Sequence, residues 1–198
     1  MKKTITCIIA ILCIISTQAK SQSNISLLLT GIGYDFSDRK NVNIYNRNIA
    51  DGKIVADPGL QFAFEVYSGD ITGIKFTQSA NLDACNKIAG ATQIMLTFRL
   101  FKIYKHSIHL GIGPKAFYRQ TWQNINGYIN DDIYQNGDVQ YKICWLSGEL
   151  DYNYRLDKKN DITFCIGQTT PVSAGVMIGI KHWFSRKSTN CITCPSFK

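Results

Sequence analysis

The amino-acid sequence predicts an all-β fold, namely an eight-stranded antiparallel up-and-down β-barrel that crosses a membrane. About eight runs alternate apolar and polar residues, as strands do when successive side chains point to opposite faces. The connections between the runs alternate between long and short, which is typical of a meander. One face of most runs is apolar and the other carries charges, so the closed sheet would have one oily and one polar surface.

Residues 1–19 precede the predicted barrel and have the three parts of a secretory signal peptide. A charged start, Lys2 and Lys3, is followed by a short apolar run and by the small-x-small sequence TQA, which ends at Ala19. The apolar run is shorter than the roughly 20 residues that a helical bilayer span requires. We therefore expect export with cleavage after Ala19, and an uncleaved anchor is the alternative.

The strands come next, and the stretch LQFAFEVYSGDITGIKFTQ (residues 60–78) illustrates their pattern. Leu60, Phe62 and Phe64 face one way, Gln61 and Glu65 face the other, and SGD forms a tight turn, so the stretch predicts a hairpin. The sixth run changes phase near Trp145–Leu146, which predicts a β-bulge there. The predicted strands are 24–36, 59–67, 71–79, 91–103, 107–118, 139–156, 161–167 and 173–184.

The connections favour a particular kind of barrel. Those after the first, third and fifth strands are long, and those after the second, fourth and sixth are short. Bacterial outer-membrane barrels have the same asymmetry, with short periplasmic turns and long external loops. The long, Asn- and Asp-rich loops are 37–58, 80–90 and 120–138, and loops on a rigid barrel are where binding usually resides.

The surroundings of the polar face distinguish a membrane barrel from a soluble one. In a membrane barrel the polar face would fill a narrow lumen, where buried charges must be paired. The predicted lumen cluster is Glu65, Arg99, Lys115, Glu149, Asp151 and Arg155, with the three acids pairing across the lumen with the arginines, Lys75 or Lys115. The alternative is an exported soluble lipocalin-like barrel, whose oily interior would bind a small apolar ligand.

Aromatic residues favour the membrane barrel, because membrane interfaces select aromatic side chains on both sides of an apolar belt. One predicted band lies at the short-turn end and the other at the long-loop end. The first contains Tyr67, Tyr104, Tyr154, Trp183 and Phe184, and the second contains Tyr34, Phe36, Phe117, Tyr118, Trp122 and Tyr141.

The stretches IHLGIGPKAFYR, GELDYNYRLDKKNDITFCIG and GVMIGIKHWF resemble strands of the OmpA/OmpX-like group, small Gram-negative outer-membrane β-barrel proteins. The resemblance lies in pattern and covers nearly all of the mature chain. It implies that the aromatic end of the last strand, Phe184 or Trp183, is recognised by the barrel-assembly machinery. The chain departs from the group by continuing through 185–198, which we expect to be a periplasmic tail after a barrel domain at 20–184.

The tail and the histidines carry the candidate groups for chemistry. Cys191 and Cys194 form a Cys-x-x-Cys spacing, a candidate redox pair without a second ligand pair for zinc. A third, distant alternative is an outer-membrane lipid-modifying enzyme, which would need serine, histidine and an acid side by side. His182 and Ser185 do not meet this need, because they are three residues apart and so lie on opposite faces of a strand. We therefore expect no catalytic residues, no enzyme activity, no cofactor and no metal.

The formal charge of +8 decides the expected partners. The sequence contains no nucleic-acid-binding module, so we expect the charge to face outer-membrane lipid and lipopolysaccharide. The expected function is a structural or adhesive role through the surface loops, with an extracellular ligand bound there. A general pore is not expected, because eight strands enclose little more than their own side chains.

Overall fold

The computed structural model describes residues 22–36, 41–46, 50–51, 53–130, 133–135 and 137–185. The predicted signal peptide and the candidate pair Cys191 and Cys194 lie outside these residues. Among the described residues, no helix is long and apolar enough to cross a membrane.

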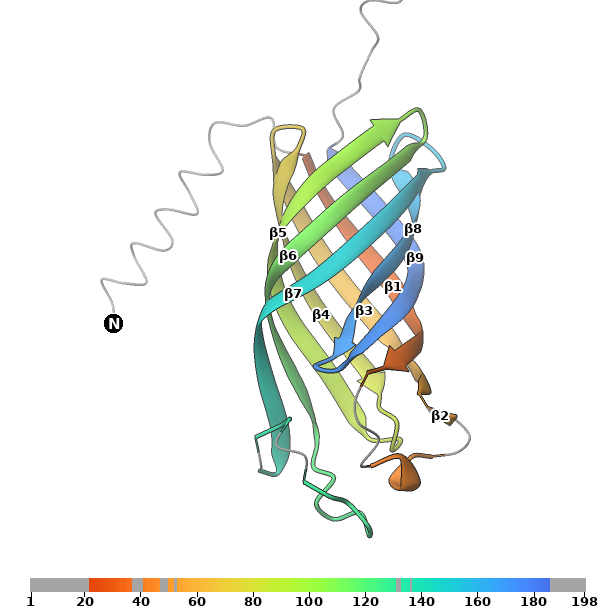
Figure 1. Cartoon of the computed structure of the whole chain (residues 1–198). Helices are drawn as coiled ribbons and strands as arrows, with labels where there is room; N and C mark the ends of the chain where they lie inside the picture. The colour runs from red at the N-terminus through yellow and green to blue at the C-terminus, as the bar shows by residue number, and fades with distance from the viewer. Residues whose placement is uncertain are drawn as a thin grey trace, which may run out of the picture.

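The described chain forms one nine-stranded antiparallel sheet that closes on itself (Figure 1). Closure comes from β1, which pairs with β9 on one side and with β3 on the other. The elements are β1 (Gln22–Asp35), the 3-10 turn η1 (Val42–Ile44), β2 (Ala50–Asp51), β3 (Ile54–Ser68), β4 (Thr72–Leu82), β5 (Ile88–Ile103), β6 (His106–Gln120), β7 (Val139–Arg155), β8 (Asn160–Thr170) and β9 (Ser173–Ser185). Because β2 has only two residues and pairs only with Ile54 and Val55 at the start of β3, the barrel has eight strands, and the predicted fold class is confirmed.

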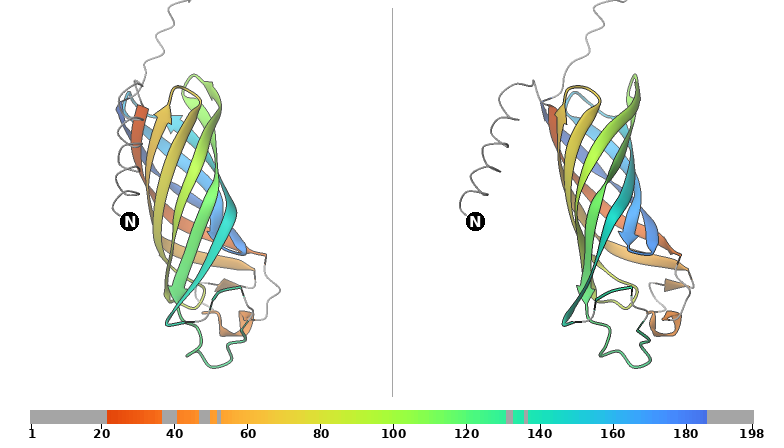
Figure 2. Two further views of the ribbon diagram at one scale, coloured as in Figure 1. Left: turned by 90° about the vertical axis from the view of Figure 1, so that its left-hand side faces the viewer. Right: turned by 60° about the vertical axis from the view of Figure 1, so that its left-hand side comes forward.

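The two ends of the barrel differ as the connections predicted. The tight turns β3–β4, β5–β6 and β7–β8 lie at one end, together with the start of β1 and the end of β9 (Figures 1 and 2). Two of these turns contain residues with positive φ, Gly69 at 87° and Tyr104 at 51°. At the opposite end, the long connections lie against one another, whereas β8 and β9 are joined by only Pro171 and Val172.

The predicted β-bulge in the sixth strand is confirmed. Gly113 of β6 pairs with Ser147 of β7 and Lys115 pairs with Cys144, so Pro114 lies opposite both Trp145 and Leu146. The extra residue turns Trp145 and Leu146 to the same, outer surface, where they are 81% and 79% exposed. The phase change thereby keeps Glu149 and Asp151 on the inner face.

The outer surface of the barrel is apolar and its interior is polar. Large apolar side chains of every long strand point outward, among them Leu27, Phe62, Phe76, Leu96, Ile112, Ile143, Ile166 and Ile178. The buried residues are mostly polar or charged, including Gln61, Lys75, Gln93, Glu149 and Lys181. The lipocalin-like alternative is therefore wrong, because it requires an oily interior.

The prediction of two aromatic bands is only partly right. Tyr67, Phe117, Trp122 and Trp183 are buried, because they share the strand parity or the loop contacts of the polar interior. Tyr104, Phe184, Tyr34, Phe36 and Tyr141 are exposed on the outside, as membrane-interface aromatics are. The sequence thus placed these residues at the correct ends but did not separate inward from outward side chains.

Candidate functional site

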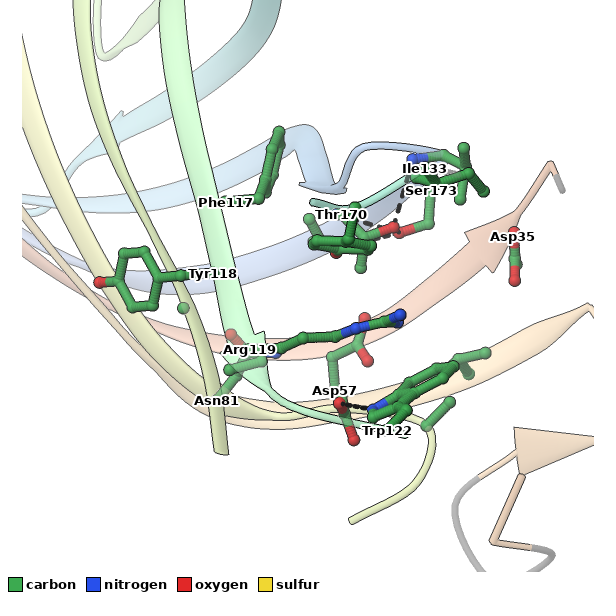
Figure 3. A pocket seen from close by; sticks show the side chains of 18 of the residues that line it. Asp35, Asp57, Asn81, Phe117, Tyr118, Arg119, Trp122, Ile133, Thr170 and Ser173 are labelled. Atoms are coloured by element: carbon green, nitrogen blue, oxygen red, sulfur yellow. Dashed lines mark hydrogen bonds between the residues drawn. The ribbon is translucent and has the colours of Figure 1, made fainter. Parts of the chain in front are cut away.

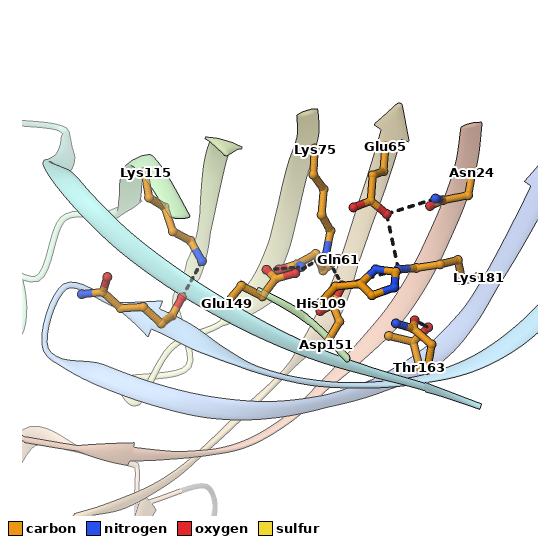
Figure 4. A network of polar contacts seen from close by, with 12 residues as sticks. Asn24, Gln61, Glu65, Lys75, His109, Lys115, Glu149, Asp151, Thr163 and Lys181 are labelled. Carbon is orange, nitrogen blue, oxygen red and sulfur yellow. Dashed lines mark hydrogen bonds and ion pairs between the residues drawn. The ribbon is translucent and has the colours of Figure 1, made fainter. Parts of the chain in front are cut away.

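A network of charged side chains crosses the middle of the lumen (Figure 4). The ammonium of Lys75, on β4, donates to Glu149 and, at 2.7 Å, to Asp151, both on β7. Lys181, on β9, lies 3.4 Å from Glu65 and 3.5 Å from Asp151. Three carboxylates therefore share two ammonium groups, all of them almost fully buried, and the network joins four strands around the barrel.

The predicted lumen residues fall into two groups. Glu65, Glu149 and Asp151 belong to this network, whereas Lys115 lies nearer the loop end and donates to the backbone oxygen of Gln168. Arg99 and Arg155 are half-buried at the short-turn end and line a small pocket there. The structure therefore does not bring all six together.

Of the four cations predicted to pair with the acids, only Lys75 does so among the described residues, and Arg99, Lys115 and Arg155 do not. The guanidinium of Arg99 lies 5.0 Å from the centre of the Tyr67 ring, and no ion pair joins it to a carboxylate among the described residues. Its expected role falls to Lys181, which the sequence reasoning missed. The sequence pattern could have identified Lys181, because it has the same inward strand parity as Met177 and Gly179.

Neutral groups complete the filling of the lumen. The Asn24 amide donates to Glu65 at 3.0 Å and the Gln61 amide to Glu149 at 3.3 Å. The Tyr67 hydroxyl and His109 Nδ1 are 2.6 Å apart. Glu149, Asp151 and Cys165 offer ligand atoms within 4.8 Å of one another. Lys75, however, already supplies positive charge to both carboxylates. This arrangement can therefore plug the lumen.

A second assembly covers the long-loop end of the barrel. We call it the loop platform, and it consists of residues 41–46, 83–87 and 121–130. The backbone N–H of Asn46 donates to the oxygen of Ala84 at 2.8 Å. The side chain of Asn41 bonds both the N–H and the oxygen of Ile129, at 2.9 and 3.0 Å. Parts of all three predicted surface loops are thus tied into one structure.

The loop platform shares a small apolar core with β2 and the start of β3. Val55, Ala84 and Trp122 are buried there, and the half-buried residues packed on them are Ile44, Tyr45, Ala50, Cys85, Ile125 and Tyr128. Tyr45 and Tyr128 both contact the Trp122 ring edge-on, with ring centres 6.1 Å apart in each case. Apolar packing of this kind orders loops that would otherwise be solvated.

Asp83 joins two segments of the loop platform, 83–87 and 121–130. One carboxylate oxygen accepts from the backbone N–H groups of Cys85, at 2.9 Å, and Lys87, at 2.8 Å. The other accepts from the Trp122 indole N–H at 2.7 Å. Burial raises the pKa of the Asp83 carboxyl above its ordinary value, and the three N–H donors oppose that shift. Burial also raises the pKa of the Cys85 thiol to about 12, so Cys85 is no reactive thiolate.

A cavity, here called the mouth pocket, is lined by residues of the loop platform and of the strand ends beside it (Figure 3). Its volume is about 60 Å³, which is room for a few water molecules or one edge of a small polar ligand. Its polar lining includes Asp35, Asp57, Asn81, Asp83, Arg119, Thr169, Thr170 and Ser173. None of these residues was in the predicted lumen cluster, although Asp57, Asn81 and Asp83 lie in the predicted surface loops 37–58 and 80–90. Their meeting depends on which strand ends the barrel brings together.

Arg119, at the end of β6, supplies the positive charge in the lining of the mouth pocket. Its guanidinium lies 3.5 Å from the centre of a Trp122 ring and 4.0 Å from the centre of the Tyr134 ring. Its Nε donates to the side-chain oxygen of Gln140 at 2.9 Å. Stacking on two aromatic faces and one charge-assisted hydrogen bond fix the direction of this side chain.

Replacing Trp122 with phenylalanine should open the loop platform. The change keeps an aromatic ring but removes the indole N–H, which leaves one buried oxygen of Asp83 without its donor. The expected cost is about 1–3 kcal/mol in the local stability of the loop platform. Protease cleavage within 121–130 of the folded protein should become faster.

The matched control is Trp145→Phe, because Trp145 is exposed on the outer face of the barrel. Cleavage of that variant should equal cleavage of the parent. Equal cleavage of both variants would show that the bond from Trp122 to Asp83 does not hold the loops together.

Comparison with known proteins gives matches to solved structures only. The chain matches no protein-family model and no curated protein. It is similar to the crystal structure of Ail, the attachment invasion locus protein of Yersinia pestis, in complex with the heparin analogue sucrose octasulfate. Identity is 10%, the TM-score is 0.46, and the match covers 83% of this chain and 97% of that one.

Two further barrels are similar at the same level. For Neisserial surface protein A, identity is 8%, the TM-score is 0.46, and coverage is 83% of this chain and 97% of that one. For OprG from Pseudomonas aeruginosa, identity is 12%, the TM-score is 0.44, and coverage is 84% and 95%. The chain itself is a closed eight-stranded antiparallel β-barrel, an assignment that follows from its own strand pairing.

Proposed function

We propose that the chain is an outer-membrane protein that acts at the cell surface through its loop platform, in a structural or adhesive role. The observation that carries this proposal is the apolar outer face of a closed barrel whose charged residues are inside. In water that face would be a continuous apolar surface far beyond what soluble monomers expose. In a bilayer it is the expected lipid-facing belt.

The orientation in the membrane follows from the loops. Short turns face the periplasm in outer-membrane barrels and long loops face outward, which puts the loop platform outside the cell. The signal peptide at 1–19 would direct export, and the 185–198 tail would lie in the periplasm, where Cys191 and Cys194 stay a candidate redox pair. The outer face would contact lipid and lipopolysaccharide.

The last strand offers one residue to the barrel-assembly machinery. Phe184 is 56% exposed on the outside of β9, whereas Trp183 is 3% exposed and donates its indole N–H to Asp161 at 2.7 Å. An outward aromatic residue is accessible to another protein during assembly, and an inward one is not. The proposed recognition element is therefore Phe184.

A general pore is not supported by this lumen. The side chains of β3, β4, β7 and β9 meet across its centre, and a cavity beside Lys115 and Met177 has a volume of only about 10 Å³. That is about the smallest space that holds one water molecule. Surface binding by the loop platform would account for loops that are tied to one another. Conduction through the lumen would not require such loops.

Fractionation of cells that express the chain tests the location. We expect recovery in the outer-membrane fraction and a change of gel mobility between unheated and heated samples, because small barrels stay folded in detergent until heated. Recovery in the soluble periplasmic fraction, without a mobility change, would contradict the proposal.

Lysine labelling of intact cells tests the orientation. A membrane-impermeant amine reagent should modify Lys53 and Lys87, at the long-loop end, before it modifies Lys105, Lys158 and Lys159, at the short-turn end. Labelling of all five only after lysis would contradict an outward loop platform. Preferential labelling of the short-turn lysines would show the opposite orientation.

A further inference from the structure

We infer that the mouth pocket binds an uncharged sugar residue, whose hydroxyl groups bridge Arg119 and Asp57. The inference deepens the surface-binding role proposed above and rests on it. Four features carry it: an unpartnered buried donor, a facing carboxylate that does not reach it, the charge of the pocket and the pocket's size.

The unpartnered donor belongs to Arg119. The residue is 6% exposed, and its Nη2 atom is buried without a hydrogen-bond partner among the described residues. Figure 3 shows the side chain extending into the space between Asp57 and Thr170. The two aromatic rings and Gln140 hold the guanidinium, so it cannot turn away to find another acceptor. A buried donor without a partner is unfavourable and calls for an acceptor in the pocket.

The carboxylates of the pocket do not supply that acceptor. Asp57 is 3% exposed and lines the same cavity, yet no ion pair joins Arg119 to any carboxylate within the described part of the chain. Asp83 is occupied by three N–H donors. Arg119 and Asp57 therefore line one cavity without bonding each other, and Asp57 is hydrogen-bonded to Thr169 instead. A third group in the cavity could bond both.

The charge of the pocket restricts that third group. Three carboxyl groups, Asp35, Asp57 and Asp83, line the pocket together with one guanidinium. Burial raises the pKa of the Asp57 carboxyl to about 7, so this group is only partly ionised near neutral pH. The pocket still carries no excess positive charge, so a sulfate or phosphate ligand would meet net repulsion. A bare metal ion would leave the donor of Arg119 unpartnered. The carboxylates here are also not among the described residues whose ligand atoms lie within 4.8 Å of one another.

A hydroxyl group satisfies both sides, because it accepts one hydrogen bond and donates another. It can accept from Arg119 Nη2 and donate to the carboxylate of Asp57. Asn81, Thr169 and Ser173 add further donors and acceptors around the same space. A ligand with several neighbouring hydroxyl groups and no charge is a sugar. The volume of about 60 Å³ admits one edge of the ring while the rest stays outside the barrel mouth.

The experiment uses the full-length protein in lipid nanodiscs and saturation-transfer NMR. The probes are glucose, galactose, mannose and N-acetylglucosamine at millimolar concentration, and a sulfated heparin oligosaccharide. The variants are Arg119→Met and Asp57→Asn. The matched control is Lys53→Met, since Lys53 is a cation at the same rim but contacts the Tyr34 ring instead of the pocket.

We expect at least one neutral sugar to bind the parent and Lys53→Met equally. Both pocket variants should bind it about tenfold more weakly, because each loses a charge-assisted hydrogen bond. Asp57→Asn keeps the shape of the side chain, so it remains informative if Arg119→Met disturbs the loops. The heat-dependent gel mobility of each variant reports whether its barrel is folded.

Three results would overturn the inference. They are no binding of any neutral sugar, equal binding by parent and pocket variants, and binding of the sulfated oligosaccharide that is lost in Arg119→Met. No sugar binding by a protein that is recovered in the outer membrane with outward loops would mean that the pocket holds water only. The proposed location and orientation would then still stand, so the two failures are distinguishable.

Discussion

Replacing Lys75 with methionine is expected to lower the free energy of unfolding by about 3–5 kcal/mol, the range seen when one partner of a buried ion pair is removed. Lys75 is the only described residue that forms an ion pair with Glu149, and it also forms one with Asp151. Methionine fills a similar volume without the charge. Urea unfolding of the protein in detergent micelles, followed by the fraction of heat-modifiable protein on a gel, would measure the change.

A second substitution separates lost charge from lost packing. Adding Glu149→Gln to Lys75→Met removes the carboxylate that has lost its partner, so part of the stability should return. The control is Lys105→Met, at the exposed β5–β6 turn, which should cost less than about 1 kcal/mol. If Lys75→Met unfolds at the same urea concentration as the parent, the network does not stabilise the barrel.

The fold could be predicted because strand periodicity and connection length are local properties of the sequence. Alternation fixed which residues share a face, and the phase change at Trp145 and Leu146 located the bulge. Even the inward side of Glu65, Glu149 and Asp151 follows from parity.

The strand ends were predicted less well. β3 begins at Ile54, inside the predicted loop 37–58, and the predicted loop 80–90 shortens to 83–87 because β4 reaches Leu82 and β5 begins at Ile88. The two-residue strand β2 has no alternating pattern either.

The ion pairs could not be predicted from parity alone. Parity says that Arg99 and Lys181 both point inward, but the height of each residue along the barrel depends on the stagger between strands. Lys181 lies near the level of Glu65 because both pair with neighbouring positions of β1. Lys181 pairs with Ser26, and Glu65 pairs with Asn24. That register is a property of the closed barrel and not of any one strand.

The loop platform was the least predictable part. The sequence indicated that the long loops carry binding, yet it gave no sign that Trp122 bonds Asp83 or that Arg119 stacks on Trp122. These contacts join residues from separate loops and strand ends, which only the closed barrel brings together. The tryptophan was instead expected at the membrane interface, since aromatic residues near loop ends are typical there.

Replacing Gly179 with alanine should disrupt the seam at which the barrel closes. Gly179 of β9 pairs with Leu28 of β1, and a Cβ atom there would lie 2.0 Å from the Leu27 oxygen and 2.6 Å from the Leu28 Cα. Both contacts are with backbone, so no side chain can move aside and the two strands must separate. We expect a loss of stability at or above the upper end of the roughly 1–3 kcal/mol that overpacking costs, together with a lower yield of heat-modifiable protein.

The matched control is Gly148→Ala on β7, where the nearest atom to an added Cβ is 3.9 Å away. That distance is ordinary van der Waals contact, so the variant should fold like the parent, within about 0.5 kcal/mol. Because both changes add the same methyl group to a strand glycine, propensity cannot account for a difference between them. Equal yields would mean that β1 and β9 can move apart freely, and closure would then rest on the lumen network instead of on close backbone contact at the seam.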